Sequence, residues 1–181
     1  MSDGKSYFHK NNHRLSEKDV IEYVLQRFQD VKHSKKIKNM IAFHTSNKNM
    51  IMAHDQEELK ILGNIVASYK KRSFSDILTD YESHLTLAMS KSPTIKTNTN
   101  VIMHIFGYFL KYLNQNEKEL FLSRLEKFRE GKITLGKTLL EMSPVAYRFD
   151  RTYLANQTYF LLYSDIDPKT IFQPMNIKEY E

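Results

Sequence analysis

The sequence of 181 residues contains no cysteine. Without a thiol, this polypeptide cannot form a disulfide, a thiolate nucleophile, a cysteine-ligated zinc site or a cysteine-held iron–sulfur cluster. No run of residues approaches the roughly 18 apolar residues of a membrane-spanning helix, and the first residues mix charged and polar side chains with few apolar ones. We therefore expect a soluble, cytoplasmic protein whose length fits one domain.

Segments with the period-two alternation of β-strands are also missing. Apolar residues instead recur at three- and four-residue steps between short breakers, which is typical of amphipathic helices. This pattern predicts an all-α fold, a single-domain antiparallel bundle of about seven or eight helices. We expect residues 16–165 to form the helical domain, with a flexible N-terminus at 1–15 and a C-terminal tail at 166–181.

Capping residues and breakers predict where the helices begin and end. Ser16 with Asp19, and Asp55 with Glu58, have the spacing of a capping box, in which a side chain binds the backbone of the first turn. Pro144 is expected to end the seventh helix, and Ser92-Pro93 the fourth. The eight helices are expected to begin near Ser16, Ile37, Asp55, Ser75, Asn100, Asn116, Thr134 and Asp150.

One helix carries polar residues that a pure core helix would not need. The apolar residues of segment 101–113 form a stripe at helical spacing, and His104, Tyr108 and Lys111 share a second stripe beside it. This second stripe could face a ligand. The alternative interpretation is that His104 and Tyr108 are half-buried and hydrogen-bond to neighbouring backbone.

A second group of candidate site residues lies in segment 43–54. His44 and Lys48 are one helical turn apart, so the lysine could hold a phosphate or carboxylate while the histidine donates a hydrogen bond or moves a proton. A histidine satisfied by backbone or water is the alternative. The segment lacks a His-x-x-x-His pair with a carboxylate partner, so we predict no metal site. The expected pocket consists of His44, Lys48, His54, Asn100, His104, Tyr108 and Lys111.

Positive charge is concentrated near the N-terminus. The net charge is +6, and most of the excess of lysine and arginine falls within residues 1–54. A polyanion is the natural partner of such a surface, although basic runs on helices are often simply solvated. The runs 32–38 and 69–72 contain the residues that we predict to contact phosphate: Lys35, Lys36, Lys38, Lys70, Lys71 and Arg72.

Residues 131–138 satisfy the letter pattern of a Walker A phosphate-binding loop. Such a loop must follow a buried parallel strand, but five of the seven residues before Gly131 are charged. We therefore interpret Gly131 as the left-handed residue that ends a helix. The sequence predicts no nucleotide hydrolysis and no bound cofactor.

Four segments, taken in order, resemble the YbgA-like domain family, a bacterial family of unknown function. Together they cover roughly residues 38–165. The chain departs from the family pattern at residues 163–165, where the last family segment usually ends in a sequence that contains proline. The segments are Phe43-His44 with Lys48, Met52-Ala53-His54 and Gly63; Asn100 with His104, Gly107 and Tyr108; residues 129–135; and Tyr153-Leu154 with Gln157 and Tyr159.

The resemblance implies a helical domain found alone or fused behind an iron–sulfur domain similar to desulfidases that act on thiolated uracil in nucleobases or transfer RNA. A chain without cysteine would be the accessory half, with sulfur removal on another polypeptide. The leading hypothesis is a non-catalytic module that binds RNA, transfer RNA in particular, or docks onto a desulfidase-like iron–sulfur protein. The alternatives are a small enzyme or anionic-ligand receptor with a His/Lys pocket, and a protein–protein adaptor.

Overall fold

A computed structural model describes residues 15–150 and 152–166. Within these residues the chain is helical and has no strand, which confirms the all-α prediction. The expected flexible N-terminus and most of the C-terminal tail lie outside the described residues. The elements are α1 Glu17–Ser34, α2 Ile37–His54, α3 Gln56–Ala67, η1 Ser68–Lys70, α4 Phe74–Met89, α5 Ile95–Leu110, α6 Gln115–Arg129, α7 Leu135–Phe149, η2 Leu154–Asn156 and α8 Thr158–Tyr163.

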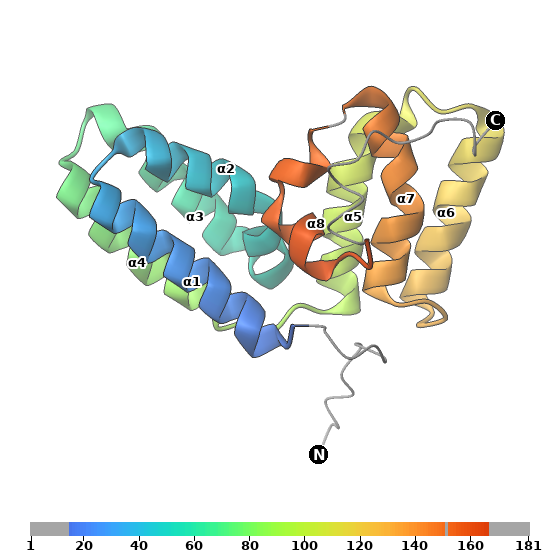
Figure 1. Cartoon of the computed structure of the whole chain (residues 1–181), viewed down its shortest axis with the longest axis horizontal. Helices are drawn as coiled ribbons and strands as arrows, with labels where there is room; N and C mark the ends of the chain where they lie inside the picture. Colours follow the sequence, from blue (N-terminus) through green and yellow to red (C-terminus); the bar gives the residue numbers. More distant parts are fainter. Residues whose placement is uncertain (1–14, 151, 167–181) are drawn as a thin grey trace, which may run out of the picture.

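The helices are arranged as two halves that share one core. Helices α1 to α4 form one half and α5 to α8 the other, as Figure 1 shows. Helix α2 joins the halves, because it packs against α3 and α4 on one side and against α5 and α8 on the other. Apolar residues from both halves belong to a single buried cluster. The bundle is therefore continuous, and its junction lies along α2. Within the described part of the chain, no helix is long and apolar enough to cross a membrane.

Several helix starts were predicted from their caps. Ser16, Asp55 and Thr134 cap α1, α3 and α7 as expected, each accepting a hydrogen bond from a first-turn backbone N–H. Two starts fall two residues earlier than predicted: α4 is capped by Ser73 and α6 by Asn114. In both cases a neighbouring polar residue offered an equally plausible cap two positions further along.

The prediction that Asn100 caps the fifth helix is wrong. Helix α5 begins at Ile95, and its cap is Thr94, which forms a reciprocal capping box with Thr97. Asn100 lies in the second turn of the helix and is exposed. The usual capping signature has an acidic or amide residue at the third helical position, so the Thr94 and Thr97 pair was missed.

Pro144 does not end α7, which continues through it to Phe149. Proline has no N–H, so the carbonyl of Leu140 loses its helical donor. The hydroxyl of Ser143 donates to that carbonyl oxygen at 2.8 Å instead. The helix therefore tolerates the proline, and the extra turn carries Phe149 to the junction of the halves.

Gly131 follows α6 with a positive φ of 70°, as predicted. The N–H of Lys132 donates to the carbonyl of Lys127 at 2.8 Å, which closes the helix end. The Walker-like residues 131–138 therefore lie between two helices rather than after a strand.

Candidate functional site

One wall of the candidate site is the exposed face of α5 and the turn that follows it. Ile105 and Phe109 face the core, whereas His104, Tyr108 and Lys111 are exposed. His104 and Tyr108 are therefore not half-buried, which was the alternative interpretation of this stripe. Tyr112 lies one helical turn beyond Tyr108 in sequence and is also exposed. Three members of this stripe, at positions 104, 108 and 112, are thus spaced four residues apart, which places them on one side.

The opposite wall comes from distant parts of the chain. The end of α7 supplies Phe149 and Asp150, the following turn supplies Tyr153, and α2 supplies Lys48. These segments and α5 enclose a hollow of about 570 Å³ at the junction of the two halves. Its lining consists of Lys48, His104, Ile105, Tyr108, Phe109, Tyr112, Phe149, Asp150 and Tyr153.

Five aromatic rings in the lining contact one another in a continuous cluster. The rings of Phe109 and Phe149 are stacked with centroids 5.9 Å apart, and Tyr112 contacts Phe149 at 5.0 Å. Tyr153 meets Phe109 edge-on at 6.0 Å, and Tyr108 meets Tyr112 at 6.2 Å. Aromatic pairs at these distances support one another, so the hollow offers a largely preformed apolar surface for a flat ligand.

Positive groups surround this aromatic surface. The ammonium of Lys111 lies 4.5 Å from the ring centroid of Tyr108 and 4.8 Å from that of Tyr112. The guanidinium of Arg148 lies 4.8 Å from the ring of Phe149 and pairs with Glu117 at 2.6 Å. Lys48 has no carboxylate partner among the described residues. The hollow can therefore hold a planar group that carries negative charge at its edge.

The pKa of the Tyr112 hydroxyl depends on its position beside Lys111 and Tyr108. Hydrogen bonding with Lys111, followed by hydrogen bonding with Tyr108, lowers the pKa of Tyr112 below its usual value of 10.0. Burial raises the pKa of Tyr81 and Tyr163 far above that value. Tyr112 should therefore ionise before these two buried tyrosines.

We expect Tyr112→Phe to remove a phenolate ionisation that lies below the usual tyrosine pKa of 10.0, in a titration followed by ultraviolet absorbance. Lys111→Gln should move that step to higher pH, because the neutral amide no longer favours the tyrosinate. Tyr23→Phe, at an exposed tyrosine on α1, serves as the control and should leave the step in place. Persistence of that step in Tyr112→Phe would show that it does not belong to Tyr112, and an unchanged step in Lys111→Gln would contradict the geometry described for Lys111.

His44 does not line the hollow, although Lys48 on the same stripe does. Its Nδ1 lies 3.0 Å from the Tyr81 hydroxyl of α4, and a β-carbon at Gly63 of α3 would be 3.7 Å from its Nε2. The ring therefore faces the α1 to α4 half. Burial, and then the charge of Lys48, lowers the pKa of His44 below 6.5, which favours the neutral ring. The partner of His44 is thus a tyrosine hydroxyl, rather than the backbone or water of the alternative interpretation.

His54 and Asn100 also lie elsewhere. His54 is buried at the end of α2, with Nδ1 2.5 Å from the carbonyl oxygen of Lys91 and Nε2 3.2 Å from Glu17. Asn100 is exposed on α5 and is not part of the lining. The structure thus brings together Lys48, His104 and Tyr108 of the expected pocket, with Lys111 at its edge. Within the described part of the chain, no three acidic or histidine side chains are grouped to hold a metal ion.

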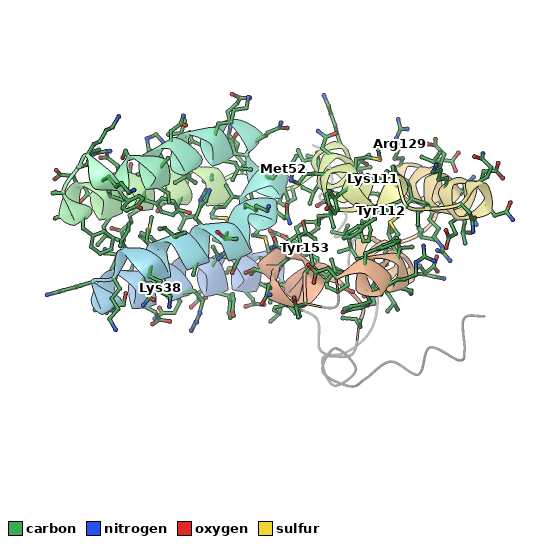
Figure 2. All side chains as sticks on the ribbon, turned by 90° about the horizontal axis from the view of Figure 1, so that it is seen from above. Lys38, Met52, Lys111, Tyr112, Arg129 and Tyr153 are labelled. Atoms are coloured by element: carbon green, nitrogen blue, oxygen red, sulfur yellow. The ribbon has the colours of Figure 1, made fainter. Side chains whose placement is uncertain are left out.

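The residues predicted to contact phosphate lie at the far end of the α1 to α4 half. Lys35 and Lys36 form the turn between α1 and α2, and Lys38 lies in the first turn of α2. The other three lie between α3 and α4, and Figure 1 places both connections at the same end. Figure 2 shows Lys38 at that end and Lys111, Tyr112 and Tyr153 beyond the junction. Arg72 pairs with Asp80 at 2.6 Å, whereas the five lysines have no carboxylate partner among the described residues. We call these five lysines the basic end.

Six lining residues were not among the residues predicted from the sequence to form the pocket. Ile105 and Phe109 were predicted only as part of the apolar stripe of the helix, and the other four are Tyr112, Phe149, Asp150 and Tyr153. The four-residue spacing from His104 through Tyr108 would have indicated Tyr112. Tyr153 belongs to a segment that carries the family resemblance, but its periodicity marked it only as part of a helix. Phe149 and Asp150 come about 40 residues after α5 in the sequence, and nothing in the local pattern predicts that they reach it.

The fold and the hollow define a helical-bundle domain with an aromatic, cation-flanked pocket between its halves. Residues 48–164 match the family described as "Protein of unknown function (DUF1722)", and the chain belongs to this YbgA-like family. It is 25% identical over 125 residues to the "Uncharacterized protein YbgA" of Escherichia coli (strain K12), covering 68% of this chain and 74% of that protein. No solved structure matches the chain. The matched segment contains every lining residue of the hollow.

Proposed function

We propose that this chain is a cytoplasmic, non-catalytic RNA-binding module and that its hollow holds an unpaired base. The observation that carries the proposal is the set of five aromatic rings and the neighbouring Lys48 and Lys111 around one cavity. Proteins that bind single-stranded RNA stack its bases on aromatic side chains and neutralise its phosphates with lysine or arginine. The exposed ring of Tyr108 and the half-exposed ring of Tyr112 are the surfaces on which a base would stack.

The phosphate contacts of this proposal fall into two groups. Lys48 and Lys111 are next to the hollow and would hold the phosphates that flank the bound base. The basic end would contact a more distant part of the same RNA through charge alone. Transfer RNA, the RNA suggested by the family resemblance, has unpaired loops for the first contact and an extended backbone for the second. A desulfidase-like iron–sulfur protein on another chain would then act on the RNA that this module holds.

A receptor for a small anionic ligand is the competing proposal, favoured by a hollow of about 570 Å³, which is the size of a small-molecule pocket. An acid–base cluster of His44, Lys48, His54 and His104 has less support, because the imidazoles of His44 and His54 are engaged with Tyr81 and Lys91. The two remaining candidates therefore differ in the size of the anion. A small ligand would bind the hollow without involving the basic end.

Titrating RNA binding against salt tests the proposal. We expect a plot of log binding constant against log salt concentration to slope downward, and Lys48→Ala to reduce that slope by about 0.7, the value for one phosphate of a single strand. Lys96→Ala is the matched control, because Lys96 is an exposed lysine of α5 outside the hollow. A flat slope would reject RNA binding. Salt-insensitive binding of a small metabolite would favour the receptor instead.

A further inference from the structure

Asp150 is the one carboxylate among the residues that line the hollow. It sits where α7 ends, beside the stacked rings of Phe109 and Phe149. A negative charge at this place opposes the binding of phosphate, which the neighbouring lysines favour. An acidic residue in a site built for an anionic ligand therefore needs a separate explanation.

The orientation of the Asp150 side chain is fixed by the turn that follows it. Its Oδ1 accepts three hydrogen bonds, from the N–H and the hydroxyl of Thr152 and from the N–H of Tyr153, each at 3.0 Å. Its Oδ2 has no partner among the described residues. One oxygen thus stabilises the turn, while the other oxygen of this lining residue can accept a hydrogen bond from a ligand.

We propose that Oδ2 of Asp150 selects guanine as the base that enters the hollow, an assignment that rests on the proposed RNA-binding function. A carboxylate only accepts hydrogen bonds. The pairing edge of guanine offers two adjacent donors, the ring N1–H and the exocyclic amino group. Adenine and cytosine each place a ring-nitrogen acceptor beside their single amino group, and the imide N–H of uracil lies between two carbonyls. Guanine alone presents two adjacent donors without an acceptor between them.

The tyrosines and lysines of the lining do not account for a preference between bases. Stacking on Tyr108 or Tyr112 does not discriminate between bases, since every base has a π-face. The lysines contact phosphate, which carries no sequence information. Asp150 is thus the lining residue whose chemistry distinguishes one base edge from another by accepting adjacent donors.

Three short single-stranded RNAs that differ at one central base test this assignment. The central base is guanine in the first RNA, hypoxanthine in the second and adenine in the third. Hypoxanthine is guanine without the exocyclic amino group. We expect wild-type protein to bind the guanine RNA about 5- to 10-fold more tightly than the adenine RNA, with hypoxanthine in between. This is the lower part of the range for a bidentate base contact, because the single oxygen Oδ2 accepts from both donors. Fluorescence anisotropy at fixed salt measures all three affinities.

Asp150→Asn is the matched variant. Its amide oxygen can still accept the hydrogen bonds of the turn, while an NH₂ group, which donates, replaces the second carboxylate oxygen. It should lose the preference for guanine and bind the adenine RNA at least as tightly as the wild type does. Equal affinity of the wild type for guanine and adenine, or a preference that persists in Asp150→Asn, would overturn the assignment but leave the RNA site standing. Failure of the wild type to bind any of the three RNAs would overturn the RNA-binding function and the assignment together.

Discussion

Replacing Tyr108 and Tyr112 together by alanine is expected to weaken the binding of single-stranded RNA by about 10- to 100-fold. The estimate follows from the roughly 1 to 3 kcal/mol that one base gains by stacking on an aromatic side chain. Both rings are largely accessible, with exposed fractions of 62% for Tyr108 and 50% for Tyr112, so they are available to a ligand. Fluorescence anisotropy with a labelled oligonucleotide measures the change.

The accessibility of both rings also makes the experiment interpretable. Neither ring is part of the buried core, so the double variant should keep its helical circular dichroism. Its unfolding free energy should fall only by the roughly 0.5 to 1.5 kcal/mol that each lost ring pair contributes. Tyr23→Ala provides the control, because Tyr23 on α1 is 47% exposed and lies outside the hollow. Tyr23→Ala should bind RNA as the wild type does. If the double variant also kept full affinity, the hollow would not be the base-binding site.

Tyr159→Ala is expected to reduce the unfolding free energy by about 3 to 5 kcal/mol, the range for truncating a large buried aromatic residue. Tyr159 is fully buried on α8, and its hydroxyl donates to Asn98 Oδ1 of α5 at 2.7 Å. Its ring also meets that of Tyr163 edge-on at 5.1 Å. The substitution would thus remove both a ring from the core and a buried contact between α5 and α8. Urea unfolding followed by circular dichroism gives the change.

Two further substitutions separate the contribution of the Tyr159 hydrogen bond from that of its ring. Tyr159→Phe keeps the ring but leaves Asn98 Oδ1 without that donor, and should cost about 1 to 3 kcal/mol. Leu161→Ala lies on the same helix at a side chain that is 39% exposed, so it should cost less than either tyrosine variant. A loss in Tyr159→Ala no larger than that in Leu161→Ala would contradict the placement of Tyr159 in the core.

Much of the helical architecture could be predicted because it depends on local patterns. The apolar spacing of α1 and α5 indicates their buried faces, and Asp55 caps α3 through its own side chain. The predicted start of α5 and the predicted end of α7 were wrong, because each helix uses an uncommon hydrogen-bonding arrangement at that point. The Thr94 box uses threonine at both positions, and the hydroxyl of Ser143 replaces the donor that Pro144 lacks.

The candidate site could be predicted only in part, because a pocket between elements depends on tertiary packing. The α5 stripe identified His104 and Tyr108 from spacing alone. A histidine near a lysine can face either the core or a ligand, and the sequence does not say which. For His44 the outcome depends on Tyr81, 37 residues away, and for Asp150 it depends on the extra turn of α7 beyond Pro144.

Mapping RNA contacts by nuclear magnetic resonance tests the central claim most directly. Isotope-labelled protein would be titrated with a short single-stranded RNA, and backbone amide shifts would be compared along the chain. We predict the largest changes in segments 104–112 and 149–153 and at Lys48, with smaller, salt-sensitive changes at the basic end. Changes confined to the basic end, or no change in the segments that line the hollow, would show that the aromatic cavity does not hold a base.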